Sequence, residues 1–231
     1  MVRFRLPCVI LLFLLLAPAA HGALPSGEEM LARIATTQPA PVAFVVNYVE
    51  APTEGRALFA VRVIADGTGH ARIDVQDLQG GLTRSSFFGV EKKGAVQTIE
   101  HAPLWLQWWM GRPVAEIVKS AQVSISTRSL AHAGGEILWV IGAGPRDLDA
   151  PQLHIERETG LLRRVVSGGD DGPVVPARLD DYTTQDGVVT RFPKRLTLVL
   201  NRREVTLVKT WLRVGEDARI DPEEFLPSTP R

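Results

Sequence analysis

From Pro41 to the end of the chain, apolar residues recur in short runs with the spacing of β-strands rather than of helices. The runs are separated by turn-like segments such as Glu158-Thr159-Gly160, and long helices do not alternate with them as they do in parallel sheets. The expected strands cover residues 42–50, 56–65, 72–76, 82–90, 95–100, 123–126, 136–141, 152–157, 161–167, 175–183, 188–200 and 205–214. The pattern predicts one mainly β domain with about 11–12 antiparallel strands, either a barrel or one strongly curved sheet.

Two short amphipathic helices accompany these strands. Ser26 and Glu29 have the three-residue spacing of a capping box, and apolar residues follow on one side of the helix that they begin. This helix ends near Thr36 and is too short to persist alone, so we expect it to cover part of the sheet. The second helix is expected in the middle of the chain, over residues 114–121.

The segment from Pro103 to Met110 contains three of the five tryptophans of the chain. Trp105, Trp108 and Trp109 stand at i, i+3 and i+4, which places them on neighbouring positions of a helix surface. The segment is apolar almost all round, so a helix here must be covered. Two interpretations stay open: a core helix that plugs the open side of a β-sheet, and a lid over a cavity that holds an apolar ligand.

The first 22 residues have the features of a secretory signal peptide. Arg3 and Arg5 form a basic start, residues 9–16 form an unbroken apolar core, and Ala20-His21-Gly22 is a small-x-small cleavage site. The apolar core is too short to span a membrane. Cys8 lies inside this core and is poorly placed for a lipid anchor. We therefore expect cleavage and export.

The expected mature chain, residues 23–231, is a single domain without cysteine, so no disulfide stabilises it. Its length is sufficient for one sizeable apolar core. Loss of the two signal-peptide arginines leaves 24 basic against 26 acidic residues, a net charge of −2. This charge predicts no attraction to nucleic acid or to an anionic membrane surface. No second apolar run reaches spanning length, and we expect a soluble monomer.

The motifs of catalysis and of cofactor binding are missing from the sequence. The histidines of the mature chain, His70, His101, His132 and His154, have no second ligand at metal spacing. There is neither a G-x-S-x-G elbow nor a phosphate-binding glycine loop. Adjacent acidic residues such as Asp180-Asp181 point to opposite faces of a strand or are solvated. The sequence predicts no catalytic residues, no metal and no cofactor, and it favours binding over catalysis.

Three stretches of the mature chain have a recognisable layout: residues 139–143 with 151–160 read as strand–turn–strand, residues 192–198 with 205–214 as a last hairpin, and residues 220–225 as a closing segment. In these stretches the chain resembles the periplasmic lipoprotein-carrier superfamily, which includes the LolA carrier, the LolB outer-membrane receptor and the RseB/MucB-type envelope sensors. The resemblance extends over most of the mature chain as a common layout with scattered residues.

The resemblance implies an open, strongly curved antiparallel half-barrel, capped by the N-terminal helix and the mid-chain helices, with an apolar hollow. It implies a periplasmic protein that binds acyl chains of lipids or lipoproteins for transfer toward the outer membrane, with a membrane-bound donor or acceptor protein as a further partner. Each methylene removed from water contributes about 0.8 kcal/mol, so a long acyl chain contributes on the order of 10 kcal/mol. A dry apolar hollow would offset the cost of exposing such a chain to water, and no chemical reaction is needed.

The ligand-binding residues expected on this basis are apolar and lie in the predicted strands and in the tryptophan segment. The cavity would be built from Phe44, Val46, Phe59, Val61, Ile73, Val75, Val123, Ile125, Trp139, Leu196 and Leu198, with Trp105, Leu106 and Trp109 in the lid. The strands do not reveal which of their faces lines the hollow. The Arg-Pro of the LolA carriers, whose arginine helps to latch the lid, is missing here, and Arg62 could serve instead or extend to the rim.

Other functions remain open at this stage. The chain could be a sensor or adaptor of the RseB/MucB kind, although it is too short for the additional C-terminal domain of those proteins. It could also be a structural or interaction protein with a filled core and no ligand. A lipid hydrolase is the remaining class.

Overall fold

The computed structural model describes residues 24–38, 40–52, 55–92, 95–97, 101–144, 147, 150–167, 174–182, 184–185, 188–189, 192–200 and 203–225. The expected signal peptide lies outside these residues. The strands are β1 Phe44–Glu50, β2 Phe59–Ala65, β3 Ala71–Asp77, β4 Thr83–Phe88, β5 Val90–Lys92, β6 Ala95–Gln97, β7 Arg128–Ala133, β8 Glu136–Ile141, β9 Gln152–Glu156, β10 Leu162–Ser167, β11 Val174–Asp180, β12 Thr184–Gln185, β13 Val188–Val189, β14 Arg195–Leu200 and β15 Arg203–Val214.

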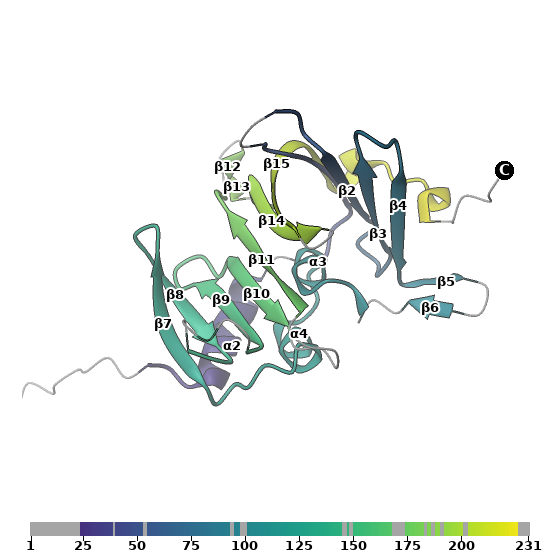
Figure 1. Cartoon of the computed structure of the whole chain (residues 1–231). Coiled ribbons are helices and arrows are strands. Elements are labelled where there is room, and N and C mark those ends of the chain that lie inside the picture. Colours follow the sequence, from purple (N-terminus) through teal and green to yellow (C-terminus); the bar gives the residue numbers. More distant parts are fainter. Residues whose placement is uncertain are drawn as a thin grey trace, which may run out of the picture.

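Within the described residues, one 11-stranded sheet has the order β4-β3-β2-β1-β15-β14-β11-β10-β9-β8-β7. The neighbouring strands are antiparallel, and β1 and β15 join the two ends of the chain in the middle of the sheet. β4 and β7 remain as edges, so the sheet does not close. Figure 1 shows this sheet curving around the helices. The predicted open, strongly curved antiparallel half-barrel with a few helices is confirmed.

The helices are α2 Gly27–Thr37, α3 Leu104–Trp109 and α4 Val114–Ser120. The capping box before α2 is formed: Glu29 N donates to Ser26 Oγ at 3.1 Å, and Ser26 N donates to Glu29 Oε2 at 2.7 Å. α2 lies beside β8–β10, whereas α3 lies in the hollow between β10–β11 and β2–β4 (Figure 1). Within the described residues, no helix is long and apolar enough to cross a membrane.

The two faces of the sheet bury different parts of the chain. The inner face of β1, with Phe44 and Val46, belongs to a large core cluster that also includes the helices. The outer face, with Val45 and Ile64, forms a smaller cluster with Phe225. Phe225 ends the 3-10 helix η3 (Pro222–Phe225), which follows η2 (Gly215–Ala218). The closing segment of the chain therefore covers the outside of β1 and β2.

The expected strand at residues 123–126 is not formed. After α4 the chain takes a left-handed conformation at Gln122, with a φ of 56°. Val123 N then donates to a carbonyl of α4, and Thr127 N closes a turn, so these backbone groups cannot join a ladder. The alternating pattern arises because Val123 and Ile125 pack inward from a loop. The strand β7, which the pattern did not predict, follows instead as a largely exposed edge.

Two other expected strands are divided. The run 82–90 breaks at Gly89, whose φ is 75° and where a Cβ would lie 2.2 Å from Gly69 O, so only glycine is accommodated. The run 188–200 is interrupted by Pro193, which cannot donate to a ladder. β13 and β14 are therefore separate strands.

Candidate functional site

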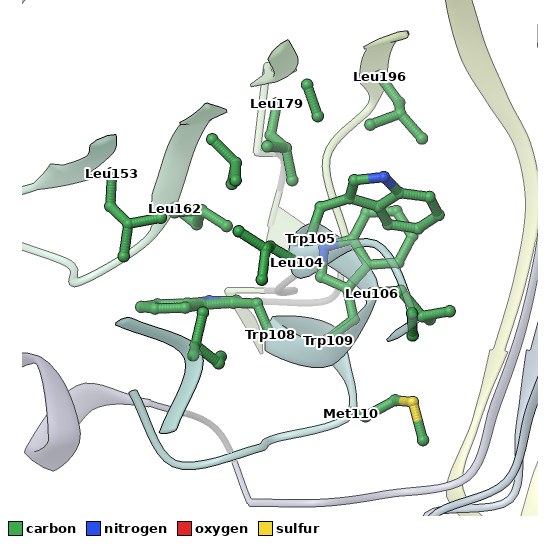
Figure 2. Close-up of a cluster of buried hydrophobic side chains, with 14 of the residues drawn as sticks. Leu104, Trp105, Leu106, Trp108, Trp109, Met110, Leu153, Leu162, Leu179 and Leu196 are labelled. Carbon is green, nitrogen blue, oxygen red and sulfur yellow. The ribbon is translucent and has the colours of Figure 1, made fainter. Parts of the chain in front are cut away.

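α3 fills the middle of the hollow with its own side chains. Every residue from Leu104 to Trp109 is buried, because the helix is surrounded by the curved sheet and by the other helices. Trp105 and Trp109 lie together with ring centroids 4.6 Å apart. Figure 2 shows these two indoles on one side of α3 and Trp108 on another side, toward Leu153 and Leu162. The three tryptophans thus do not share a single surface, because the helix is covered all round.

Trp109 stands at the centre of an aromatic cluster. Its ring stacks on Tyr48 at 6.1 Å and meets Phe44 at 6.3 Å and Phe192 at 5.4 Å. Tyr48 donates its hydroxyl hydrogen to Pro193 O at 3.0 Å, and burial raises its pKa well above the ordinary value. The phenol therefore stays neutral. The aromatic cluster is composed of Phe44, Tyr48, Trp105, Trp109 and Phe192. It connects α3, here called the plug, to β1 and to the loop before β14.

All the residues that the sequence suggested for the cavity and lid face this core. Phe44, Val46, Val61, Ile73, Trp105, Leu106, Trp109, Val123, Trp139, Leu196 and Leu198 are buried in it, and Phe59, Val75 and Ile125 pack against it while partly exposed. In this structure the tryptophan helix lies within the hollow rather than above an empty one. That these residues bind a ligand remains a prediction.

Sequence reasoning missed Tyr48 and Phe192, which complete the aromatic cluster. Tyr48 has a signal in the sequence, because it is two residues beyond Val46 on an inward-facing strand. Phe192 lies outside any strand, and nothing in its local pattern indicates its role.

The three helices are fastened to one another by side-chain hydrogen bonds. The Gln38 side chain, at the end of α2, donates to Arg112 O and accepts from Val114 N at 3.1 Å. Arg112 donates to Gln107 Oε1 at 2.7 Å and forms an ion pair with Glu116 at 3.0 Å. These bonds join the end of α2 to α4 and to the segment between α3 and α4.

The inner face is open to solvent at one end. A cleft of about 260 Å³, here called the mouth cleft, has a lining of apolar and polar side chains: Phe59, Val75, Leu82 and Val199, with Asp77, Arg84 and Ser86. Leu82 is 57% exposed at the rim. Phe59 and Val75 are two of the predicted cavity residues. The mouth cleft is thus a place where the predicted cavity residues meet water.

A buried carboxylate holds the wall of the mouth cleft in place. Glu50 Oε2 accepts from Leu58 N at 2.6 Å and from Phe59 N at 3.2 Å. Its other oxygen pairs with Arg203 at 3.1 Å. These contacts satisfy the charge and fix the start of β2, so the position of Phe59 is set by the β1–β2 turn.

A second apolar groove, of about 440 Å³, runs between α2 and α4. Its lining includes Leu31, Ala32, Ala35, Val114 and Ala115. Small side chains let the two helices approach closely while leaving space at the surface. The groove lies beside the Gln38 contacts, so movement of α4 would widen it.

The outer face of β9 carries buried polar groups. His154 Nε2 lies 2.8 Å from Gln152 Oε1, which makes this nitrogen the donor. Burial, with the nearby Arg164 charge, lowers the pKa of His154 to about 4. On the next strand, Arg163 pairs with Glu136 at 2.5 Å and with Glu156 at 2.8 Å. These contacts hold the covered half of the sheet together and face away from the hollow.

Arg62 does not serve as a latch for the helices. It pairs with Glu224 of η3 at 3.0 Å, and Arg72 donates to Glu224 O at 2.8 Å. Both arginines are on the outer face and hold the closing segment against β2 and β3. Among the described residues, no group of three His, Cys, Asp or Glu side chains is arranged to hold a metal ion.

No protein-family model and no curated protein matches the chain. Among solved structures, the chain is similar to a LolA superfamily protein from Nitrosomonas europaea, at 9% identity over 88% of this chain and 98% of that one, with a TM-score of 0.40. It is also similar to a candidate outer membrane lipoprotein-sorting protein domain from Vibrio parahaemolyticus, at 8% identity over 87% and 97%, with a TM-score of 0.41.

A third similarity is to MucB in the MucA/MucB complex of Pseudomonas aeruginosa, at 15% identity over 88% of this chain, with a TM-score of 0.32. The chain spans 61% of that structure's length. At such TM-scores the likeness carries no weight for function, which rests on the side chains of the hollow.

Proposed function

We propose that this protein is a periplasmic carrier that binds an acyl chain of a lipid or lipoprotein in its hollow and moves it toward the outer membrane. The mouth cleft is the observation that supports this proposal most directly. There, Phe59, Val75 and Leu82 present apolar surface to water, beside Asp77 and Arg84 at the rim, at the end of a hollow lined mainly by apolar side chains. Exposed apolar surface of this kind is costly unless a ligand uses it.

The cargo follows from the chemistry of the hollow. A chain of methylenes needs only apolar walls, and each methylene buried contributes about 0.8 kcal/mol. The residues around the plug, such as Leu106 and Leu196, are aliphatic or aromatic, and none of them calls for a polar ligand. Binding alone accounts for this arrangement, and the proposed function includes no catalysis.

A long chain needs more room than the mouth cleft offers, so the plug has to move. α3 and α4 are joined through Gly111, whose φ of 72° is the left-handed conformation that glycine adopts without strain. If α3 swings out about this joint, Trp105 and Trp109 leave the hollow and the mouth cleft extends along β1. The displaced indoles then cover the bound chain, so the plug of the free protein becomes the lid of the loaded one.

Opposite faces of β4 provide a matched test. Ser86 lines the mouth cleft, whereas Thr83 is on the outer face of the same strand. Both are exposed, so a tryptophan at either position should be tolerated. In the mature chain we expect Ser86→Trp to weaken binding of a long-chain fluorescent fatty acid about tenfold or more, while Thr83→Trp leaves it unchanged.

Two results would count against the carrier. The first is equal binding by both variants, which would remove the mouth cleft from the binding site. The second is native mass spectrometry of protein purified from the periplasm that shows no co-purifying acyl-chain mass. A stable complex with an inner-membrane protein in a pull-down, without bound lipid, would favour the sensor or adaptor instead.

A further inference from the structure

A separate cleft, of about 490 Å³, lies at the opposite end of the hollow from the mouth cleft. It is bounded by α2, by β7 and β8, and by the turn between β9 and β10. Its lining combines two arginines, Arg33 and Arg157, with the apolar surfaces of Trp139 and Leu130. We call it the arginine cleft. A lining that is both cationic and apolar suits a ligand that has an anionic group joined to an apolar part.

The two guanidinium groups are not neutralised by carboxylates. Among the described residues, neither Arg33 nor Arg157 forms an ion pair, in contrast to Arg163 in the same half of the sheet. Glu29, one turn before Arg33 in α2, directs its carboxylate to Ser26 N at 2.7 Å, as part of the capping box. The Ser26 hydrogen bonds lower the pKa of Glu29, and the Arg33 charge, which still attracts this carboxylate, lowers it further. Because neither guanidinium group is held in a direct ion pair among the described residues, both can still contact an anionic ligand.

The arginine cleft is preorganised by contacts within the protein. The Arg33 guanidinium lies over the Trp139 ring, 6.0 Å from its centroid, which limits the positions that it can take. The β9–β10 turn is closed by Gly160 N donating to Glu156 O at 2.9 Å, and Arg157 N donates to Ile137 O at 3.0 Å. The turn that carries Arg157 is thereby held against β8.

Gly160 brings this turn into contact with α2. Its φ is 69°, and a Cβ at this position would lie 1.8 Å from Thr37 Oγ1. Only glycine allows so close an approach, and the approach sets the distance between the two arginines. They come from segments that are far apart in the sequence, and the close packing at Gly160 and Thr37 brings them to one cleft.

The apolar part of the ligand would lie on Trp139 and Leu130. Leu130 is 43% exposed at the rim, whereas Trp139 is buried and belongs to the same core cluster as the plug. An apolar chain entering here would therefore meet the core of the hollow. Two guanidinium groups match the several oxygens of a phosphate better than the two oxygens of a carboxylate.

We propose that the arginine cleft binds the phosphate of an anionic lipid, with Arg33 and Arg157 on the phosphate oxygens and the start of the apolar chain against Trp139. The proposal rests on the proposed function in that the ligand is a lipid. It adds a preference for an anionic head group, which an apolar hollow alone would not show.

The test compares two soluble lipids with identical chains, dihexanoyl phosphatidylglycerol and dihexanoyl phosphatidylcholine, by titration calorimetry with the mature chain. We expect the anionic lipid to bind about tenfold or more tightly, because only its net charge attracts the two arginines. Arg33→Gln and Arg157→Gln should each remove most of this preference. Arg157→Lys should keep part of it, because lysine retains the charge without the planar fork.

Arg219→Gln is the matched control, because Arg219 is exposed beside η3 on the other side of the molecule, and it should leave the preference intact. Equal binding of the two lipids by the unaltered protein, or a preference that survives in Arg33→Gln and Arg157→Gln, would overturn the proposed subsite while leaving the carrier function standing. Binding of neither lipid would overturn both. Inorganic phosphate that binds as tightly as phosphatidylglycerol would show a site for a small anion and overturn the lipid assignment.

Discussion

Two strands of the same antiparallel sheet, β9 and β4, reach opposite degrees of burial. β9 is buried at all of its positions. β4 is exposed at its first four positions, and the mouth cleft opens beside it. Part of this difference comes from the strands, because the exposed positions of β4 are the polar Thr83, Arg84, Ser85 and Ser86, and β4 is an edge of the sheet. The rest follows from the helices, which lie beside β8–β10 and in the middle of the hollow (Figure 1).

The comparison shows what each half is suited to do. The covered half is a conventional core, closed by the aromatic cluster and by hydrogen bonds among the helices. The open half keeps Phe59 and Val75 within reach of solvent, at the cost of exposed apolar surface. A protein that needed only stability would gain by covering both halves, and we propose that the open half is where a ligand binds.

The largest effect is expected from the plug. Trp109 is fully buried among four aromatic rings, so Trp109→Ala should lower the free energy of unfolding by about 3–5 kcal/mol. Trp211, on the outer face of β15, is 38% exposed with Arg213 over its ring, and Trp211→Ala should lower the free energy of unfolding by only about 1–2 kcal/mol. Urea denaturation measures both values. Similar losses in the two variants would contradict the picture of a plug that closes the core.

The covered half should also respond to pH through His154. Its pKa in the folded state, about 4, is below the ordinary 6.5, so the unfolded chain binds the proton more readily. Above about pH 6.5 His154 is neutral in both states and does not affect the free energy of unfolding. As the pH falls from 6.5 toward 4, the unfolded chain takes up the proton first, and the free energy of unfolding decreases by up to roughly 3 kcal/mol. His154→Gln should flatten that part of the stability profile in thermal unfolding.

His132, exposed on β7, provides the control for this measurement. His132→Gln should leave the pH profile of the unaltered protein in place. An equally steep profile in His154→Gln would mean that other groups cause the loss of stability in this range.

A smaller effect is expected where the helices join. Gln38→Ala removes hydrogen bonds to Arg112 O and to Val114 N, and should lower the free energy of unfolding by about 1–2 kcal/mol. Because the loss frees α3 and α4 from α2, hydrogen exchange of the α3 amides should become faster and fatty acid binding tighter. Slower or unchanged exchange would show that Gln38 does not hold the plug.

The smallest effect on stability is expected at the mouth cleft. Phe59 is only partly buried, so Phe59→Ala should lower the free energy of unfolding by about 1 kcal/mol, well below the cost at Trp109. Its effect on binding should be larger, with fatty acid affinity reduced about tenfold. Leu78→Ala, at an exposed turn residue outside the lining of the mouth cleft, should change neither value. If Leu78→Ala weakened fatty acid binding more than Phe59→Ala, the ligand would have to bind in another part of the molecule.

Much of the fold could be predicted because local patterns have local causes. The capping box at Ser26 and Glu29 forms as expected, and most of the apolar runs become antiparallel strands that bury one or both faces. Where the pattern failed, at residues 123–126, the backbone was already committed to the end of α4 and a turn. Alternation of apolar residues cannot distinguish a strand from a loop that buries every second side chain.

The sequence by itself determined that this chain makes antiparallel β-strands with short helices, one of them apolar almost all round, because strand period and helix spacing are properties of neighbouring residues. It left open whether the sheet closes into a barrel and which face of the strands points inward. Only the tertiary structure decided that Trp109 fills the hollow and that Phe59 stays open to water. The meeting of Arg33 and Arg157 in one cleft was decided there as well. Those outcomes depend on how segments far apart in the chain pack in space, and no run of neighbouring residues records that packing.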